Sequence, residues 1–170
     1  MKWYNKIIIL MKRLYLLRHA KSSKDDSSLS DAERPLMKRG KRDADRMGVV
    51  LRERGVKPGV IISSHAVRAL KTARLVWRHM DHSPKKIVID KRVYNAVVWD
   101  LLKVVRMIKD NADEVMLVGH NPGITSFADY LAPCGIESIP TCGVVCIGFD
   151  TDSWRKVKRR SGRCVFKEGF

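Results

Sequence analysis

Short apolar runs alternate with amphipathic stretches along most of the chain. The runs, which end abruptly at polar residues or glycine, occupy residues 14–17, 60–62, 87–89 and 115–118. Such runs are typical of strands buried on both faces of a sheet. Apolar residues at helical spacing occupy residues 41–54, 66–80 and 97–108. This alternation predicts an α/β domain with a largely parallel sheet.

The last third of the chain predicts one more helix and further strands. Residues 124–131 have the pattern of a short helix, residues 143–149 that of a strand, and residues 154–157 and 164–166 those of edge strands. With helices covering both faces of a mostly parallel, mixed sheet, we expect a three-layer α/β/α sandwich. No repeat or linker divides the chain, so we expect one domain over residues 12–170, preceded by an extension or arm at residues 1–11.

The chain carries a large excess of positive charge. Its 170 residues include 34 Lys and Arg but only 18 Asp and Glu, which gives a formal net charge of +16. A surface of this sign attracts acidic partners, which include phosphorylated small molecules, phosphoproteins, nucleic acid and anionic lipid. The net charge therefore indicates that a partner carries negative charge, but it does not indicate which reaction the protein performs.

The cysteine pattern predicts neither a metal site nor structural disulfides. Cys134, Cys142, Cys146 and Cys164 form no CxxC pair, and no histidine stands at zinc-finger spacing from them. We interpret Cys142 and Cys146 as small core thiols in a strand, and we expect a reducing, cytoplasmic compartment. The apolar run near the N-terminus is too short for an export signal or a membrane span, so we expect no membrane association.

Polar side chains follow three of the predicted strands at their carboxyl ends. Arg18 and His19 end the first run, Ser64 and then Arg68 follow the second, and His120 follows the fourth. Parallel neighbouring strands would bring these residues to one edge of the sheet, where α/β folds bind ligands. Guanidinium groups pair with phosphate oxygens, and a neutral imidazole is a nucleophile. The arrangement therefore favours phosphoryl chemistry.

The three segments together resemble the histidine phosphatase superfamily. They read LLRHA at residues 16–20, SHAVRALKTA at residues 64–73 and GHNP at residues 119–122. Arg34-Pro35-Leu36, Gly40 and Tyr94 ahead of Leu101-Leu102 make the chain similar to the SixA-type phosphohistidine phosphatases over residues 12–149. The resemblance implies a phosphoglycerate mutase-like fold and a metal-independent phosphatase without a cofactor.

The resemblance also implies a role for each residue of the three segments. His19 would accept the phosphoryl group and then lose it to water, while Arg18, Arg68 and His120 would hold the phosphoryl oxygens. Lys21 stands two residues beyond His19 and either contacts phosphate or faces water. His65, His79 and His82 lie away from the matched positions, so we expect them to be non-catalytic.

The chain departs from larger members of the superfamily in its proton donor. Those members place a glutamate or aspartate where it protonates an alkoxide, and the nearest candidates between Arg68 and His120 are Asp90 and Asp100. The imidazole of phosphohistidine leaves with less proton assistance than an alcohol requires. We therefore expect a phosphohistidine substrate, with a small phosphomonoester as the alternative.

A third hypothesis is a non-catalytic basic protein that binds nucleic acid or a phosphoprotein. The basic segment at residues 155–160 suits such a role, but a solvated edge hairpin is the simpler interpretation. Aromatic residues that could stack on bases do not interleave with this segment, which makes nucleic acid an unfavoured partner. The sequence leaves the oligomeric state open.

Overall fold

The computed structural model describes residues 11–80 and 87–169. Within these residues, one sheet has the strand order β3-β2-β4-β1-β5-β6. The strands are β1 (Lys12–Arg18), β2 (Val60–Ser63), β3 (Ile87–Ile89), β4 (Glu114–Gly119), β5 (Val144–Phe149) and β6 (Gly162–Glu168). The pairings β3-β2, β2-β4 and β4-β1 are parallel, whereas β5 and β6 are added antiparallel.

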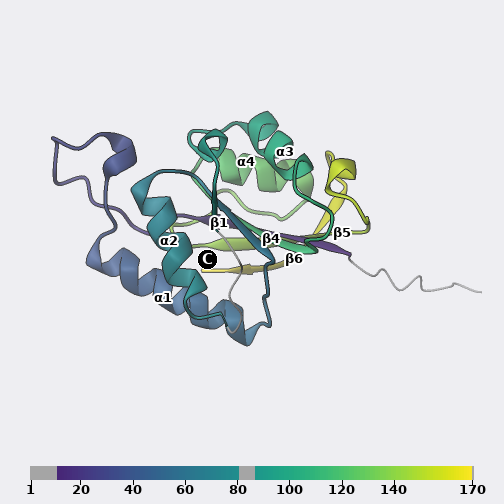
Figure 1. Ribbon diagram of the computed structural model, residues 1–170, viewed down its shortest axis with the longest axis horizontal. Coiled ribbons are helices and arrows are strands. Elements are labelled where there is room, and N and C mark those ends of the chain that lie inside the picture. Colours follow the sequence, from purple (N-terminus) through teal and green to yellow (C-terminus); the bar gives the residue numbers. More distant parts are fainter. Residues whose placement is uncertain (1–10, 81–86, 170) are drawn as a thin grey trace, which may run out of the picture.

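Helices cover both faces of this sheet (Figure 1). α1 (Lys38–Glu53) and α2 (Val67–Trp77) pack on one face, and α3 (Val98–Arg106) and α4 (Gly123–Leu131) pack on the other. Short 3₁₀ turns occupy Asp31–Glu33, Lys91–Val93 and Trp154–Lys156. The predicted three-layer α/β/α sandwich with a mixed sheet is confirmed. No helix in the described part of the chain is long and apolar enough to cross a membrane.

The alternation of side chains along β1 divides the core into two layers. Leu14 and Leu16 pack with α3 and α4, whereas Tyr15 and Leu17 pack with α1 and α2. The cysteines are all free thiols. Cys142 and Cys146 belong to the α1 and α2 layer, and burial raises the pKa of both thiols to about 12. The interpretation of these two residues as small core thiols is confirmed.

One predicted strand is wrong. Residues 154–157 form a 3₁₀ turn and not an edge strand, because Trp154 and Val157 are both fully buried three positions apart. The indole Nε1 of Trp154 donates a hydrogen bond to the carbonyl oxygen of Ala112 at 2.7 Å. Residues 164–166 lie in β6, an antiparallel edge strand, as expected.

The expected N-terminal arm at residues 1–11 lies outside the described residues except for Met11. The backbone N–H of Met11 donates to the carbonyl oxygen of Phe149, so this residue is already joined to the sheet.

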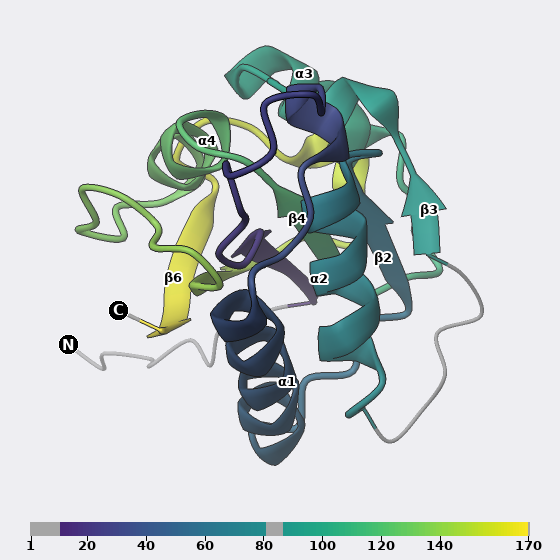
Figure 2. The same ribbon diagram turned by 90° about the vertical axis from the view of Figure 1, so that its left-hand side faces the viewer.

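The parallel strands place their carboxyl ends side by side. Arg18 on β1 is in register with Gly119 on β4, and Ser63 on β2 is in register with Val118. The backbone N–H groups of His19 and Ser64 continue these ladders by donating to β4 carbonyl oxygens. Figure 2 looks toward this edge, where the segment between β1 and α1 crosses in front of the sheet. The residues that follow three strands therefore meet at one edge, as predicted.

Candidate active site

His19 lies at this edge of the sheet, and one of its ring nitrogens is hydrogen-bonded to the backbone. Its Nδ1 is 2.8 Å from the carbonyl oxygen of Ala20. A carbonyl oxygen only accepts, so Nδ1 carries the hydrogen and Nε2 keeps its lone pair. Thr72 holds the turn in place, because its hydroxyl accepts the backbone N–H of Ala20 and donates to the carbonyl oxygen of Arg68.

The surroundings of His19 keep its imidazole neutral. Its pKa is lowered to about 4, chiefly by burial and in part by the charges of Arg68, Arg18 and Arg34, while the hydrogen bond with Ala20 partly offsets this shift. At neutral pH the ring is therefore an uncharged base with Nε2 free to attack an electrophile.

Arg68 faces His19 from the first turn of α2. Its side chain is buried, with Nε 3.4 Å from Nε2 of His19. Asp31 holds the far side of the guanidinium, accepting from Nη2 at 2.7 Å through Oδ2 and from Nη1 through its backbone oxygen. The hydroxyl of Tyr94 donates to the same Oδ2 at 2.7 Å. Asp31 therefore orients Arg68 and balances its charge.

Arg18 reaches the site from the end of β1. Its Nη1 donates to the carbonyl oxygen of Ile139 at 2.8 Å, while its buried Nε has no hydrogen-bond partner. Burial lowers the pKa of this guanidinium. A buried N–H donor without a partner is costly, and an anion at this position would satisfy it.

His120 packs against His19 from the end of β4. The two ring centroids are 5.0 Å apart, and Nε2 of His120 is 2.6 Å from the hydroxyl of Ser64. The pKa of His120 is lowered to about 3, chiefly by burial and in part by the neighbouring His19 and Arg68. The Ser64 hydroxyl already accepts the backbone N–H of Ala66, so its hydrogen is free to be donated to Nε2. This arrangement leaves the hydrogen of the neutral ring on Nδ1, which is buried and has no partner.

A cavity of about 470 Å³ opens beside Arg18, His19 and Arg68. Its lining includes Arg18, His19, Arg68, Lys21 and Arg34. The cavity therefore presents His19 among four cationic side chains, which suits a dianionic phosphoryl group, whereas His120 is not part of its lining. Lys21 is exposed at its rim, in reach of an anion and of water.

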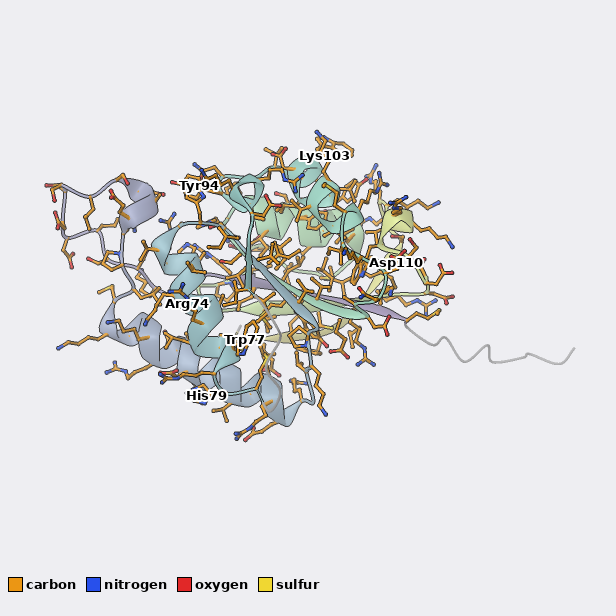
Figure 3. The ribbon with its side chains drawn as sticks, viewed as in Figure 1. Arg74, Trp77, His79, Tyr94, Lys103 and Asp110 are labelled. Carbon is orange, nitrogen blue, oxygen red and sulfur yellow. The ribbon has the colours of Figure 1, made fainter. Side chains whose placement is uncertain are left out.

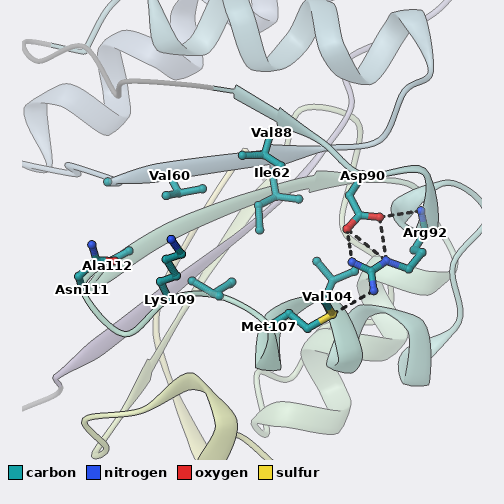
Figure 4. A pocket seen from close by; sticks show the side chains of 12 residues that line it. Val60, Ile62, Val88, Asp90, Arg92, Val104, Met107, Lys109, Asn111 and Ala112 are labelled. Carbon is teal, nitrogen blue, oxygen red and sulfur yellow. Dashed lines mark hydrogen bonds and ion pairs between the residues drawn. The ribbon is translucent and has the colours of Figure 1, made fainter.

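The two carboxylates expected as proton donors lie in other contacts. Asp90 is paired with Arg92 at 2.6 Å and lines a separate, largely apolar cavity of about 500 Å³ between β2, β3 and α3 (Figure 4). Hydrogen bonds from Arg92 lower the pKa of Asp90, the opposite of what a proton donor needs. Asp100 accepts the backbone N–H of Val97 at the start of α3. Neither contact brings a carboxyl group to His19.

Two of the remaining histidines are described by the structure, whereas His82 lies outside the described residues. His65 packs edge-on against Tyr94, with the ring centroids 4.9 Å apart. His79 is 3.1 Å from Asp45 and joins α2 to α1, far from Tyr94 in Figure 3. His65 therefore lies beside the site, and His79 does not.

Sequence reasoning missed Asp31 as a member of the site, and it placed Ser64 and Thr72 in a motif without assigning either a role. A local signal existed for Asp31, because Ser30 and Glu33 form a capping box around the turn that carries this residue. Its contact with Arg68 depends on the path of a loop, which residue patterns do not specify. No group of three or more potential metal-ligating side chains occurs within residues 11–80 and 87–169.

Comparisons of the sequence show which proteins the chain resembles. Residues 14–96 match the histidine phosphatase superfamily (branch 1). An uncharacterized chloroplastic protein of Arabidopsis thaliana is 30% identical over 161 residues, covering 90% of this chain and 73% of that protein. An uncharacterized protein of Mycobacterium tuberculosis strain H37Rv is 30% identical over 138 residues, covering 75% of this chain and 84% of that protein.

Solved structures share the whole fold. A candidate phosphohistidine phosphatase SixA from Agrobacterium tumefaciens aligns with a TM-score of 0.78 at 25% identity, covering 92% of this chain and 96% of that one. The protein histidine phosphatase SixA complexed with tungstate aligns with a TM-score of 0.74 at 17% identity, covering 91% of this chain and 95% of that one. This alignment shows a common fold. The expected phosphoglycerate mutase-like arrangement is confirmed. The chain belongs to the histidine phosphatase superfamily, as a phosphatase of the SixA type.

Proposed function

We propose that this phosphatase hydrolyses phosphohistidine through a covalent phosphohistidine on its own His19. The observation that carries the proposal is the orientation of His19. Its Nδ1 donates to the Ala20 carbonyl oxygen at 2.8 Å, and Nε2 lies 3.4 Å from the guanidinium of Arg68. Nε2 is thus a neutral nucleophile that faces a phosphate-binding group.

In the first step, Nε2 of His19 attacks phosphorus and the P–N bond to the substrate imidazole breaks. The substrate ring, which carries a proton on its other nitrogen, takes the electron pair of the broken bond and leaves as neutral imidazole, and the phosphoryl group remains on Nε2. In the second step, water attacks the phosphorus, the Nε2–P bond breaks, and inorganic phosphate leaves. Transfer through a covalent intermediate divides a difficult hydrolysis into two easier displacements.

Charge stabilisation falls to Arg18, Arg68 and His120. The Nε of Arg18 and the Nδ1 of His120 are buried donors without partners, which makes them available for phosphoryl oxygens. Removing one such donor from an enzyme costs roughly 10²–10³ in kcat. The protein histidine phosphatase SixA, which shares this fold, is complexed with tungstate in its solved structure, and tungstate is a tetrahedral oxyanion like phosphate.

The carboxylate beside the site favours a P–N substrate over an ester. Hydrogen bonds from Tyr94 and Arg68 hold the pKa of Asp31 far below its usual range. A carboxylate held ionised in this way is a poor proton donor, whereas the alkoxide leaving group of a phosphomonoester needs one. A protonated imidazole leaves without such help, which is the physical reason to place phosphohistidine first.

The test compares a phosphohistidine peptide with p-nitrophenyl phosphate and a phosphoserine peptide, using the parent and His19→Ala. We expect the parent to prefer phosphohistidine and His19→Ala to lose at least 10³-fold in kcat. Rapid quenching should trap an acid-labile, base-stable phosphoryl group on the parent. Equal turnover by His19→Ala would disprove the nucleophile. A preference for esters that collapses with Asp90→Asn or Asp100→Asn would favour a phosphomonoester phosphatase.

A further inference from the structure

Residues 38–46 at the start of α1 concentrate positive charge next to the cavity that contains His19. Lys38, Lys41, Arg42 and Arg46 are exposed on this helix. No carboxylate in the described residues pairs with any of these four side chains, while the helix's own Asp43 and Asp45 pair with Arg39 and with Arg78 and His79. These four residues, called the basic strip below, are therefore free to meet an acidic partner.

The start of α1, which carries the strip, packs against the segment that follows His19. Met37, the residue before α1, lines the cavity together with Lys21, and its backbone N–H donates to the Lys21 carbonyl oxygen at 3.0 Å. Gly40 lies so close that a Cβ there would be 2.1 Å from the same oxygen. Figure 2 shows α1 starting beside the loop that follows β1 and running away from the strand ends. A chain leaving the cavity in that direction would pass over the strip.

The placement of these charges works against the stability of the helix. α1 has no acidic residue in its first turn, and its N-cap Met37 supplies no side-chain acceptor. Cations at a helix N-terminus oppose the helix dipole, and acidic residues are favoured there. The dipole and the side chains therefore add to one positive field at the mouth of the cavity, which attracts anions.

We infer that the basic strip binds an acidic polypeptide segment next to the phosphorylated residue, so that the preferred substrate is a phosphoprotein with Asp or Glu beside its phosphohistidine. This inference rests on the proposed function for the identity of the phosphorylated residue. A polypeptide is favoured over nucleic acid because the strip holds no aromatic side chain on which bases could stack. A small phosphorylated molecule would fill the cavity without reaching the strip.

The experiment uses two peptides with a central histidine, one flanked by glutamates and one by glutamines. Binding of the fluorescein-labelled, unphosphorylated peptides is measured by anisotropy, and kcat/KM is measured on the same peptides phosphorylated on histidine. The test variant is Lys38→Gln/Lys41→Gln/Arg42→Gln. The control, Arg155→Gln/Lys158→Gln/Arg159→Gln, removes three exposed charges near the opposite end of the molecule (Figure 1). Circular dichroism confirms that both variants fold.

We expect the parent to prefer the acidic peptide in both assays. In the strip variant, the ratio between the acidic and the glutamine peptide should fall on the order of tenfold. Each exposed ion pair changes an equilibrium constant by up to about fivefold. The change should be in KM and should fade as salt rises. The control variant should keep most of the preference, because its charges lie near the opposite end of the molecule (Figure 1).

The outcomes separate the two proposals. Equal hydrolysis of both peptides by the parent, or an equal loss in the two variants, would overturn the basic strip and leave the phosphohistidine function standing. Acidic-peptide binding without hydrolysis of either phosphopeptide would contradict the phosphohistidine function and leave the strip standing. A single-stranded oligonucleotide of the same charge could also bind more tightly than the acidic peptide and lose this affinity in the strip variant. That result would overturn the acidic polypeptide as the partner of the strip in favour of nucleic acid.

Discussion

The hydroxyl of Ser64 lies 2.6 Å from Nε2 of His120, and both groups are buried. The serine follows β2 and the histidine follows β4, so the bond joins the ends of two adjacent strands. By donating to Nε2, the hydroxyl selects the tautomer that has its hydrogen on Nδ1. The pair thereby links the sheet to the orientation of the Nδ1 donor that we propose binds a phosphoryl oxygen.

Ser64→Ala should therefore lower kcat by roughly 10–100-fold with a smaller change in KM, because groups that orient an active-site histidine have effects of this size. The matched control is Ser63→Ala, which removes a buried hydroxyl that donates only to the Ser64 carbonyl oxygen. Steady-state kinetics on a phosphohistidine peptide and urea unfolding of both variants make the comparison. Equal kcat in the two variants at similar stability would rule out the orienting role.

Asp31→Asn should slow phosphohistidine and phosphoserine peptides by the same factor, about threefold to tenfold. The substitution removes the charge that orients Arg68 but no proton donor, so the nature of the leaving group should not matter. Asp25→Asn is the control, because Asp25 lines the same cavity and bonds only to Ser23. A loss above about 100-fold that is confined to the ester would identify Asp31 as a general acid.

His19 and His120 should remain neutral well below the pH at which ordinary histidines gain a proton. Their pKa values are lowered from 6.5 to about 4 and about 3, chiefly by burial. Ring signals of the free enzyme, assigned in NMR spectra with His19→Asn and His120→Asn, should not titrate between pH 8 and about pH 5.5. Titration of either ring near pH 6.5 would contradict a buried neutral pair.

The same shifts predict how stability depends on pH. Below about pH 6.5 the unfolded chain protonates both histidines and the folded chain does not, so the free energy of unfolding should fall as the pH drops toward about 4. The slope is at most about 1.4 kcal/mol per pH unit for each histidine. Urea unfolding at pH 7 and pH 5 should show a smaller loss in His120→Asn than in the parent. An equal loss would assign the effect to other groups.

Gly40→Ala should destabilise the protein by about 2 kcal/mol and reduce kcat. A Cβ at this position would lie 2.1 Å from the Lys21 carbonyl oxygen, so α1 or the loop behind His19 must move. This clash outweighs the helix propensity that alanine gains over glycine, which is about 1 kcal/mol. At Gly59 the nearest atom would be 3.8 Å from a Cβ, and Gly59→Ala should stay within about 0.5 kcal/mol of the parent. Chemical denaturation and kcat of the two variants test the difference.

Local patterns were sufficient for most of the fold. The apolar runs marked β1, β2 and β4 because a strand buried on both faces needs uninterrupted apolar residues. The run at residues 87–89 also forms a strand, β3, but this strand lies at the edge of the sheet and Val88 and Ile89 are exposed. The helix starts and ends were shifted by a few residues, as with α1, which begins at Lys38 and not at residue 41. The strand predicted at residues 154–157 failed because four residues do not distinguish a period of two from the period of three that buries Trp154 and Val157.

The sequence by itself determined which residues stand at the ends of the strands, since His19, Arg68 and His120 each follow an apolar run or open the helix after it. Only the tertiary structure decided what holds them. Asp31 reaches Arg68 across 37 positions of sequence, and Ser64 reaches His120 across 56. Such contacts depend on the path of a loop and on strand order, which are set by packing of the whole sheet and leave no periodic trace in the chain. The same packing brings the charges of α1 to the active-site cavity.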